Sequence, residues 1–420
     1  MRILQVDKFL RRVGGAACYM LDVSELLRRR GHTVEHFAMA HPANQPAAYE
    51  AYFPPQVVLD EPGGRLAERL HTAASMIHSG AARRGMSQVL DAFAPDVVHL
   101  HNIYHQLSPS ILGPIAARRI PIVMTVHDFK LVCPSYRLLD GRGPCEACVS
   151  PGAFAFRPAA ARRCKDGSLA ASGLLALEAS VHRWVGAYDP IELFLAPSEF
   201  LAERLRRGGI ASQRVRRLAN FVELDRAPVR QGPGAGVVFV GRLSPEKGID
   251  VLIRAVGLAP RLRLRIAGDG PDRAALERLA GEVAPGRVEF LGLLPRAEVD
   301  ALVQGARTAA LPARWHENMP LSVIEAMAAG VPQVVTGLGG LPELVTDGVE
   351  GLVAPVDDPA ALAAALTRLE EDTALAEAMG AAARRTATQR WGAEAHLLAL
   401  ETAYADAASR CTQRSAHRRR

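Results

Sequence analysis

The stretch Val237-Val-Phe-Val-Gly-Arg-Leu-Ser-Pro-Glu-Lys-Gly248 decides the fold of this chain. An apolar run typical of a buried parallel strand, Val237–Val240, leads into a turn that begins with Gly241. The turn opens a helix that we expect over residues 245–256, with Pro245 near its start, where the missing amide hydrogen costs nothing. A strand, a glycine turn and a helix in this order predict a Rossmann-like α/β domain.

The same turn carries two cations that suit a phosphate group. Backbone amides at a helix start favour anions, and Gly241 lets a phosphate approach the main chain closely. Arg242 offers a planar fork for phosphate oxygens, and Lys247 offers a mobile point charge. The turn therefore predicts a diphosphate site, with solubilising surface charge as the plain alternative.

Apolar runs and amphipathic stretches alternate along the rest of the chain as well. In the first half, strands are expected at 3–7, 33–38, 96–100, 122–126, 192–196 and 215–218, and helices at 16–29, 66–93, 109–118, 169–188 and 198–207. In the second half, strands are expected at 237–240, 262–267, 288–291, 308–311 and 333–336, and helices at 245–256, 272–282, 296–304 and 321–329. Between the halves, residues 226–236 are rich in proline and glycine, as linkers are.

The length of the chain favours two domains. A chain of 420 residues exceeds the size at which one core stops growing, about 250–300 residues. We expect Rossmann-like domains over 1–226 and 236–385, facing each other across a cleft that holds the ligand. Late helices are expected at 359–369, 374–385 and 393–408. The helix within 386–409 is expected to pack back toward the first domain, and residues 410–420 to form a solvated basic tail.

Composition narrows the class of protein. Apolar residues make up 49% of the chain and charged residues 22%, which is typical of a soluble globular protein. No run reaches the about 18 apolar residues of a membrane span, and the first residues lead straight into a strand, so a cytoplasmic location is expected. The net charge of +6 is scattered, which argues against a nucleic-acid partner. An anionic substrate or the inner face of a membrane attracts such charge equally well.

A second motif runs from Trp315 to Gly330 and holds two glutamates eight positions apart. Glu317 precedes a predicted helix and can reach the hydroxyls of a sugar, whereas Glu325, inside the helix, can accept hydrogen bonds from two ribose hydroxyls. Between them, residues 318–321 offer backbone amides at a helix start. These are Asn318, Met319, Pro320 and Leu321.

Polar residues in the first half follow strand ends, where the active sites of open parallel sheets lie. Gly14 and Gly15 separate the first strand from its helix and leave backbone amides open to a phosphate or an acceptor. His127 ends the strand at 122–126, and a histidine there can bond a sugar or an acceptor hydroxyl. His99, His101 and Asn102 end the preceding strand and are candidates for acceptor contacts.

Four of the six cysteines lie in a region, residues 130–167, that interrupts the alternating pattern. Cys145 and Cys148 have the spacing of a zinc knuckle, with Cys133 and Cys164 as outer ligands. A four-thiolate zinc would be structural, and disulfides are the alternative.

Taken together, the 241–248 turn, the two glutamates and Gly339-Gly-Leu-Pro-Glu343 resemble the nucleotide-binding domain of retaining GT-B glycosyltransferases of family four. The resemblance implies that Arg242 and Lys247 contact the donor diphosphate, Glu325 the ribose, and Glu317 with residues 318–321 the donor sugar. It implies base contacts near Gly268 and Leu293, and a sugar contact for His127. A subgroup with cysteines after a His-Asp pair is similar to residues 127–164.

The resemblance also implies the reaction and leaves rivals. We expect metal-independent, retaining transfer of a sugar from a nucleotide donor, by default a UDP-sugar, to an acceptor that is lipid-linked, a polysaccharide or a small natural product. An epimerase or phosphorylase uses the same architecture. A dehydrogenase is disfavoured because no Gly-x-Gly-x-x-Gly follows the first strand. A sugar-binding protein without catalysis would leave the cations and glutamates without a purpose.

Overall fold

The computed structural model describes residues 1–57, 74–152, 154–224 and 229–417. The chain divides into two compact units, one of Met1–Leu218 with Leu397–Arg420 and one of Ala219–His396. Each unit holds a six-stranded sheet whose neighbouring strands are all parallel. Two α/β units of the Rossmann-like kind are therefore present, as the alternation of strands and helices predicts.

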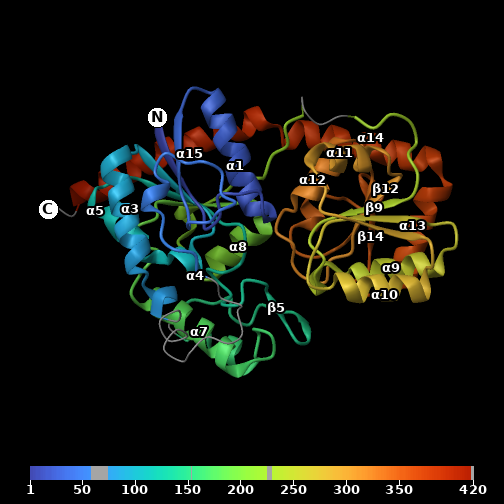
Figure 1. Ribbon diagram of the computed structural model, residues 1–420, viewed down its shortest axis with the longest axis horizontal. Coiled ribbons are helices and arrows are strands. Elements are labelled where there is room, and N and C mark those ends of the chain that lie inside the picture. The colour runs from blue at the N-terminus through green and yellow to red at the C-terminus, as the bar shows by residue number, and fades with distance from the viewer. Residues whose placement is uncertain (58–73, 153, 225–228, 418–420) are drawn as a thin grey trace. The chain divides into compact units, whose positions relative to one another are not determined.

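The first sheet has the order β2-β1-β3-β4-β7-β8 (Figure 1). Its strands are β1 (Arg2–Val6), β2 (Thr33–Phe37), β3 (Val97–Leu100), β4 (Ile122–Thr125), β7 (Leu193–Ala196) and β8 (Val215–Arg217). The helices of this unit are α1 (Gly14–Arg29), α3 (Gly80–Phe93), α4 (Tyr104–Leu107), α5 (Leu112–Ala117), α6 (Arg157–Ala161), α7 (Leu169–Trp184) and α8 (Glu199–Arg207). Strands β3 and β4 are buried along their whole length, as the continuous apolar pattern requires.

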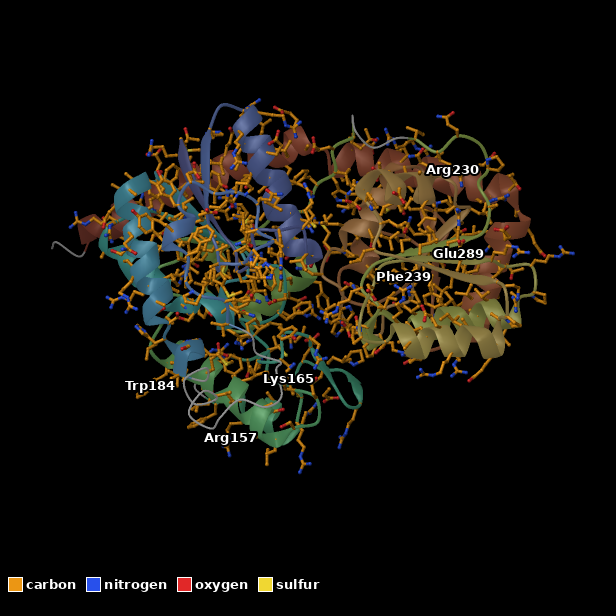
Figure 2. All side chains as sticks on the ribbon, in the orientation of Figure 1. Arg157, Lys165, Trp184, Arg230, Phe239 and Glu289 are labelled. Atoms are coloured by element: carbon orange, nitrogen blue, oxygen red, sulfur yellow. The ribbon has the colours of Figure 1, made fainter. Side chains whose placement is uncertain are left out.

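The second sheet has the order β11-β10-β9-β12-β13-β14. Its strands are β9 (Val237–Val240), β10 (Leu264–Ala267), β11 (Val288–Gly292), β12 (Thr308–Leu311), β13 (Gln333–Thr336) and β14 (Gly351–Ala354). Its helices are α9 (Ile249–Leu258), α10 (Arg273–Val283), α11 (Arg296–Gln304), α12 (Leu321–Ala328), α13 (Pro359–Glu371) and α14 (Thr373–Arg390). Helices α9 and α10 lie on one face of the sheet and α11 and α12 on the other, so that Phe239 of β9 is buried between them (Figures 1 and 2).

Both sheets have a switch point, where the strand order changes direction. In the first sheet the chain passes from β1 outward to β2 and then returns to β3 on the other side of β1. In the second sheet the same change separates β9 from β12. Ligands of open α/β sheets bind beyond the carboxyl ends of the strands at such points. The loops after β1, β3, β9 and β12 are therefore the places to look for a site.

Several local expectations are corrected. The helix expected over 245–256 is a 3-10 turn, Pro245–Lys247, followed by α9 from Ile249, because Gly248 takes a left-handed conformation with φ 67°. The helix expected over 66–93 is interrupted at residues 78–79: residues 74–77 are helical, and α3 begins at Gly80, where the Ser79 hydroxyl caps it; residues 66–73 lie outside the described residues. Strand β14 was not expected, since its sequence Gly-Leu-Val-Ala is short and lies next to a turn.

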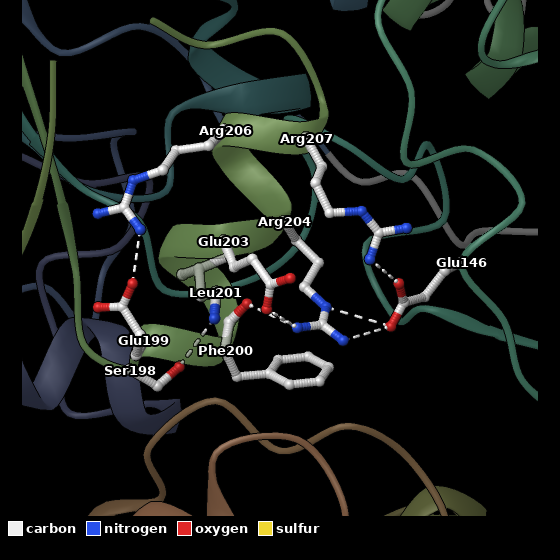
Figure 3. Close-up of polar contacts among 9 residues, drawn as sticks. All are labelled: Glu146, Ser198, Glu199, Phe200, Leu201, Glu203, Arg204, Arg206 and Arg207. Carbon is white, nitrogen blue, oxygen red and sulfur yellow. Dashed lines mark hydrogen bonds and ion pairs between the residues drawn. The ribbon is translucent and has the colours of Figure 1, made fainter. Parts of the chain in front are cut away.

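The cysteine-containing region is held to the first unit from two sides. On one side the carboxylate of Glu146 accepts hydrogen bonds from Arg204 and Arg207 of α8, at 2.7 Å and 2.9 Å (Figure 3). On the other side Lys130 Nζ lies 2.6 Å from Glu178 Oε2, and both side chains are buried. A buried ion pair holds its partners firmly because breaking it would leave an unpaired charge in the interior. The region, including α6 and α7, is thus a fixed part of the unit.

The last helix, α15 (Ala393–His417), begins in the second unit and continues in the first. There the Tyr404 hydroxyl lies 2.8 Å from His99 Nδ1, and Glu401 Oε1 lies 2.8 Å from His32 Nε2. The expected basic tail over 410–420 is corrected, because the helix runs on through His417. Arg414 forms an ion pair of 2.6 Å with Glu192, and this contact favours order at the helix end.

Candidate functional site

In the second unit, Lys247 and Glu317 meet at the switch point. Lys247 ends the turn after β9, and Glu317 lies in the loop after β12. Lys247 Nζ lies 2.6 Å from Glu317 Oε1 and 5.4 Å from the centre of the Trp315 ring. Glu317 is only 5% exposed, so its charge is partly withdrawn from water and depends on the lysine. Two residues seventy positions apart thus form one charged centre.

The glycines of Gly339-Gly-Leu-Pro-Glu343 shape the loop of Glu317. The amide of Gly340 donates to the Glu317 carbonyl oxygen at 2.6 Å. Gly339 has φ 65°, and a Cβ on it would lie 2.2 Å from the same oxygen. Only glycine fits this approach, which explains why the motif accompanies the glutamate.

The second glutamate, Glu325, lies on α12, where Arg296 of α11 lies 2.5 Å from its Oε1. The ion pair is partly exposed, with a quarter of the Glu325 side chain accessible. Arg296 was not among the residues expected in the site. Nothing in the local sequence around Arg296 indicates that this side chain will contact a carboxylate twenty-nine positions later.

Residues 318–321 lead into α12, which begins at Leu321 after Pro320. Met319 is buried, and Asn220 donates its side-chain amide to the Met319 carbonyl oxygen at 2.8 Å. This contact positions the chain just before the first amides of the helix, which favour an anion or a hydroxyl oxygen. The role expected for the segment in binding a donor sugar stays a prediction.

The turn that carries Arg242 packs against the loop after β10. A Cβ on Gly268 would lie 1.8 Å from the Gly241 carbonyl oxygen, so these two glycines allow the loops to touch. Arg242 itself is exposed on the surface of the turn. Leu293 is 80% exposed, which for a large apolar side chain is unusual and agrees with a contact surface for a flat ligand.

In the first unit, His101 and His127 form a hydrogen-bonded pair beyond β3 and β4. His101 Nε2 lies 2.8 Å from Gln5 Oε1, and His101 Nδ1 lies 2.9 Å from His127 Nε2. An amide oxygen only accepts, so His101 donates from Nε2 and, when neutral, accepts at Nδ1. His127 therefore donates from Nε2 and has its acceptor at Nδ1. Such a ring can accept a hydrogen bond from a hydroxyl group.

Burial keeps both histidines neutral. It lowers the pKa of His127 to about 3, and it lowers the pKa of His101 well below its usual range, helped by the neighbouring histidines. The network continues from His99, whose Nε2 lies 2.8 Å from the Thr125 hydroxyl and whose Nδ1 contacts Tyr404. His99 and His101, both expected to touch the acceptor, are instead fully buried within this network.

Asp7, at the end of β1, was missed as a site residue. Its side chain is 1% exposed, and burial raises its pKa to about 6, although the amides of Phe9 and Asn102 donate to it at 2.9 Å and 3.2 Å. Asn102 thus serves the site through its backbone. The available signal was an acidic residue that ends a strand at the switch point.

Gly14 and Gly15 form the first turn of α1 rather than a linker before it, which corrects the expected boundary. Gly14 has φ 70°, and a Cβ on either glycine would meet no atom within 4 Å. The start of α1 is therefore open to a ligand. The expected contact with a phosphate or an acceptor stays a prediction.

The cysteines do not form the expected zinc site. Across residues 1–57, 74–152, 154–224 and 229–417, no group of three or more His, Cys, Asp or Glu side chains is arranged to hold a metal ion. Cys133 packs into the main core of the unit, whereas Cys148 and Cys164 pack between α6 and α7. Burial, together with the charge of the neighbouring thiols, raises the pKa of Cys148 to about 12, which favours the protonated thiol.

Comparison with known proteins identifies the family. Residues 13–226 match the model described as glycosyltransferase family 4, and residues 223–386 match that of glycosyl transferases group 1. A GDP-mannose-dependent alpha-mannosyltransferase of Mycolicibacterium smegmatis is 31% identical over 397 residues, 93% of each chain. The chain belongs to the group 1 and family 4 glycosyltransferases.

Two further comparisons bear on this glycosyltransferase. A D-inositol 3-phosphate glycosyltransferase of Mycobacterium leprae is 30% identical over 350 residues, 80% of this chain and 75% of the relative. The solved structure of sucrose-phosphate synthase from Thermosynechococcus elongatus has a TM-score of 0.70 at 18% identity and covers 96% of this chain and 98% of its own. The expected GT-B fold is confirmed. None of these comparisons tests the cysteine-containing subgroup, which stays a prediction.

Proposed function

We propose that this glycosyltransferase moves a hexosyl group from a nucleotide sugar to an acceptor hydroxyl with net retention at the anomeric carbon. The observation that carries the proposal is the 2.6 Å contact between Lys247 and the buried carboxylate of Glu317, next to the start of α12. A cation suited to a diphosphate and a carboxylate suited to sugar hydroxyls are thereby adjacent.

For the donor we propose GDP-mannose rather than the UDP-sugar expected from the sequence. The support is the name of the M. smegmatis relative, which matches nearly the whole chain. In this proposal Glu325 accepts hydrogen bonds from the ribose, so the donor competes with Arg296 for that carboxylate. The base lies near Gly268 and Leu293.

The proposed reaction breaks the bond between the anomeric carbon and the diphosphate oxygen, and the electron pair leaves with the diphosphate. The acceptor oxygen attacks from the same face, and its proton passes to the departing phosphate oxygen. Arg242, Lys247 and the amides at the starts of α9 and α12 stabilise the negative charge. No metal ion is needed for this step in the proposal.

The first unit contributes neutral groups. We assign His127 Nδ1 as the acceptor of a hydrogen bond from a sugar or acceptor hydroxyl, and His101 as the residue that holds His127 in that form. Gly14 and Gly15 lie where an acceptor or the donor phosphate can approach the amides of α1. The acceptor is lipid-linked, a polysaccharide or a small natural product, and with the first of these the protein works at the inner membrane face.

One experiment tests the reaction. The purified protein is incubated with GDP-mannose, UDP-glucose or UDP-galactose, with and without D-inositol 3-phosphate and a lipid extract, and nucleotide release is measured. The proposal expects GDP release that depends on an acceptor and an α-linked product. An epimerase would change the sugar without any acceptor, and a phosphorylase would require inorganic phosphate.

A further inference from the structure

We propose that one face of α7 docks onto an anionic lipid bilayer. The α7 face comprises Leu169, Leu177 and Trp184 of α7, which are 57%, 56% and 83% exposed, with Phe154 before α6 and Val185 just after α7, which are 75% and 63% exposed. The inference rests on the proposed function, because a membrane matters to the reaction only if the acceptor is lipid-linked. It deepens that function by selecting the lipid-linked acceptor from the three classes.

The sequence of α7 differs from that of an ordinary surface helix. Leu177 and Trp184 follow Leu169 at spacings of eight and seven residues, which places all three within about 80° around the helix axis. A surface helix normally turns charged residues toward water. On α7 the apolar residues occupy that side instead.

The charged residues of α7 all point elsewhere. Glu178 and His182 are buried, and Glu178 pairs with Lys130. Arg183 donates to the carbonyl oxygen of Ser150 at 2.9 Å, and its guanidinium lies 4.0 Å from the centre of the Phe156 ring. The α7 face is therefore apolar without interruption by charge, and such an area usually marks an interaction site.

Basic residues surround the α7 face. Figure 2 shows Arg157, Lys165 and Trp184 around the ribbon of α6 and α7. Apart from Arg183, residues 154–185 hold four basic residues. Arg162 pairs with Asp140 and Lys165 with Asp166, whereas Arg157 and Arg163 are exposed. Exposed tryptophan and leucine with a basic border match the interface of a bilayer, where apolar rings enter the headgroup region and cations meet lipid phosphates.

An open groove of about 890 Å³ continues the α7 face toward α6. Phe154 and Leu177 line it together with Arg157 and Arg162. Arg162 is already paired with Asp140, whereas Arg157 is exposed beside Phe154. The groove thus has an apolar floor next to a cationic edge, and a lipid needs the same arrangement for its acyl chain and its phosphate group. Charge complementarity therefore favours an anionic bilayer over a neutral surface.

Vesicle binding tests the inference apart from sugar transfer. The full chain is sedimented with vesicles of phosphatidylcholine alone and of phosphatidylcholine with phosphatidylglycerol. We expect binding to the anionic vesicles that falls as salt rises. The double variant Leu177→Ser with Trp184→Ser should bind at least about tenfold more weakly. The free energy gained by burying two side chains of this size corresponds to more than a tenfold change in the binding constant.

Matched controls lie in the second unit. Leu258 is 61% exposed on α9, and Leu258→Ser should bind as the unchanged protein does. Likewise Arg157→Glu with Arg163→Glu should weaken binding, whereas Arg254→Glu with Arg278→Glu should weaken it less. No sedimentation with anionic vesicles, or an equal loss in the controls, would overturn the proposal.

Tryptophan fluorescence gives a second readout on the unchanged protein. Trp391 is buried, and Trp184 is 83% exposed, so the difference between the protein and its Trp184→Phe variant reports on Trp184. We expect a blue shift with anionic vesicles and quenching by lipids with brominated acyl chains. An unchanged difference spectrum contradicts the inference.

The two proposals fail separately. The Leu177→Ser with Trp184→Ser variant should keep its binding of GDP-mannose and lose transfer to an acceptor in vesicles. Vesicle binding without any transfer from a nucleotide sugar would contradict the proposed function and leave the docking face intact. If the unchanged protein and this double variant transferred sugar to the vesicle acceptor equally well, only the docking proposal would be contradicted.

Discussion

The two units share one architecture but place opposite kinds of chemistry at their switch points. In the first unit, buried neutral histidines bond to one another and to Gln5 and Tyr404. In the second unit, Lys247 with Glu317 and Arg296 with Glu325 form charged pairs. Burial disfavours charge, so the first site suits hydroxyl groups, whereas the paired charges of the second suit a nucleotide diphosphate. The shared fold places each site at a switch point, and the side chains there determine which ligand chemistry the site suits.

The largest expected effect is an unequal response to acid. In the first unit burial lowers the pKa of His36 and His127 to about 3, of His105 to about 4, and of His101 further. The unfolded chain takes up these protons near pH 6.5 and the folded unit does not, so stability is lost as pH falls from 6.5 toward 4. At pH 5.5 the loss is about 1.4 kcal/mol per histidine, or about 5.6 kcal/mol for four.

The second unit supplies the control. Among its described residues, His396 is the one histidine whose pKa clearly changes, and burial lowers that pKa to about 4. In the first unit Asp7 offsets a small part of this loss of stability, because its raised pKa favours the folded state below pH 6. Calorimetry from pH 7.5 to 5 should therefore show one transition that moves to lower temperature much faster than the other. Parallel movement of both transitions would break the comparison.

Removal of the cation at the charged centre should have the next largest effect. We expect Lys247→Ala to lower kcat/KM about 100- to 1,000-fold, because one positioned charge is lost where the leaving diphosphate develops. Lys247→Arg should keep part of the rate. The exposed Arg254 of α9 is the matched control, and Arg254→Ala should be unchanged. A thermal melt checks that folding is intact, and a loss of rate in both variants would point to general electrostatics instead.

Glu325→Ala should weaken donor binding by about tenfold, the size of one hydrogen-bonded charged partner. Arg296→Ala removes the competitor for the same carboxylate, and we expect it not to weaken binding. Titration with GDP and GDP-mannose measures both. Weaker binding in the Arg296 variant would show that the arginine contacts the donor itself.

The smallest expected effect concerns the histidine pair. His101→Leu removes the acceptor that holds His127 with its proton on Nε2, and we expect a fall in kcat of about three- to tenfold with little change in KM for the donor. The ¹⁵N shifts of the His127 ring report the tautomer directly. Tyr404→Phe alters the bond to His99 but not the His101–His127 bond, so it should leave the tautomer unchanged. An unchanged tautomer in His101→Leu would remove the positioning role.

The parallel α/β units and the residue types of the proposed donor site follow from local sequence patterns alone. Apolar runs with a strand period, the glycine after β9 and the prolines near helix starts act through immediate neighbours, so they can be read in order along the chain. The same holds for the surroundings of Lys247 and Glu317, whose motifs are local even though their contact is not.

Which distant groups meet depends on the tertiary fold. Tyr404 reaches His99 across 305 positions, and Arg296 reaches Glu325 from another helix. The structure also shows that Glu178 and His182 of α7 are buried, whereas Leu169, Leu177 and Trp184 are exposed. Burial and partner choice depend on how whole helices pack, which no short window of sequence contains.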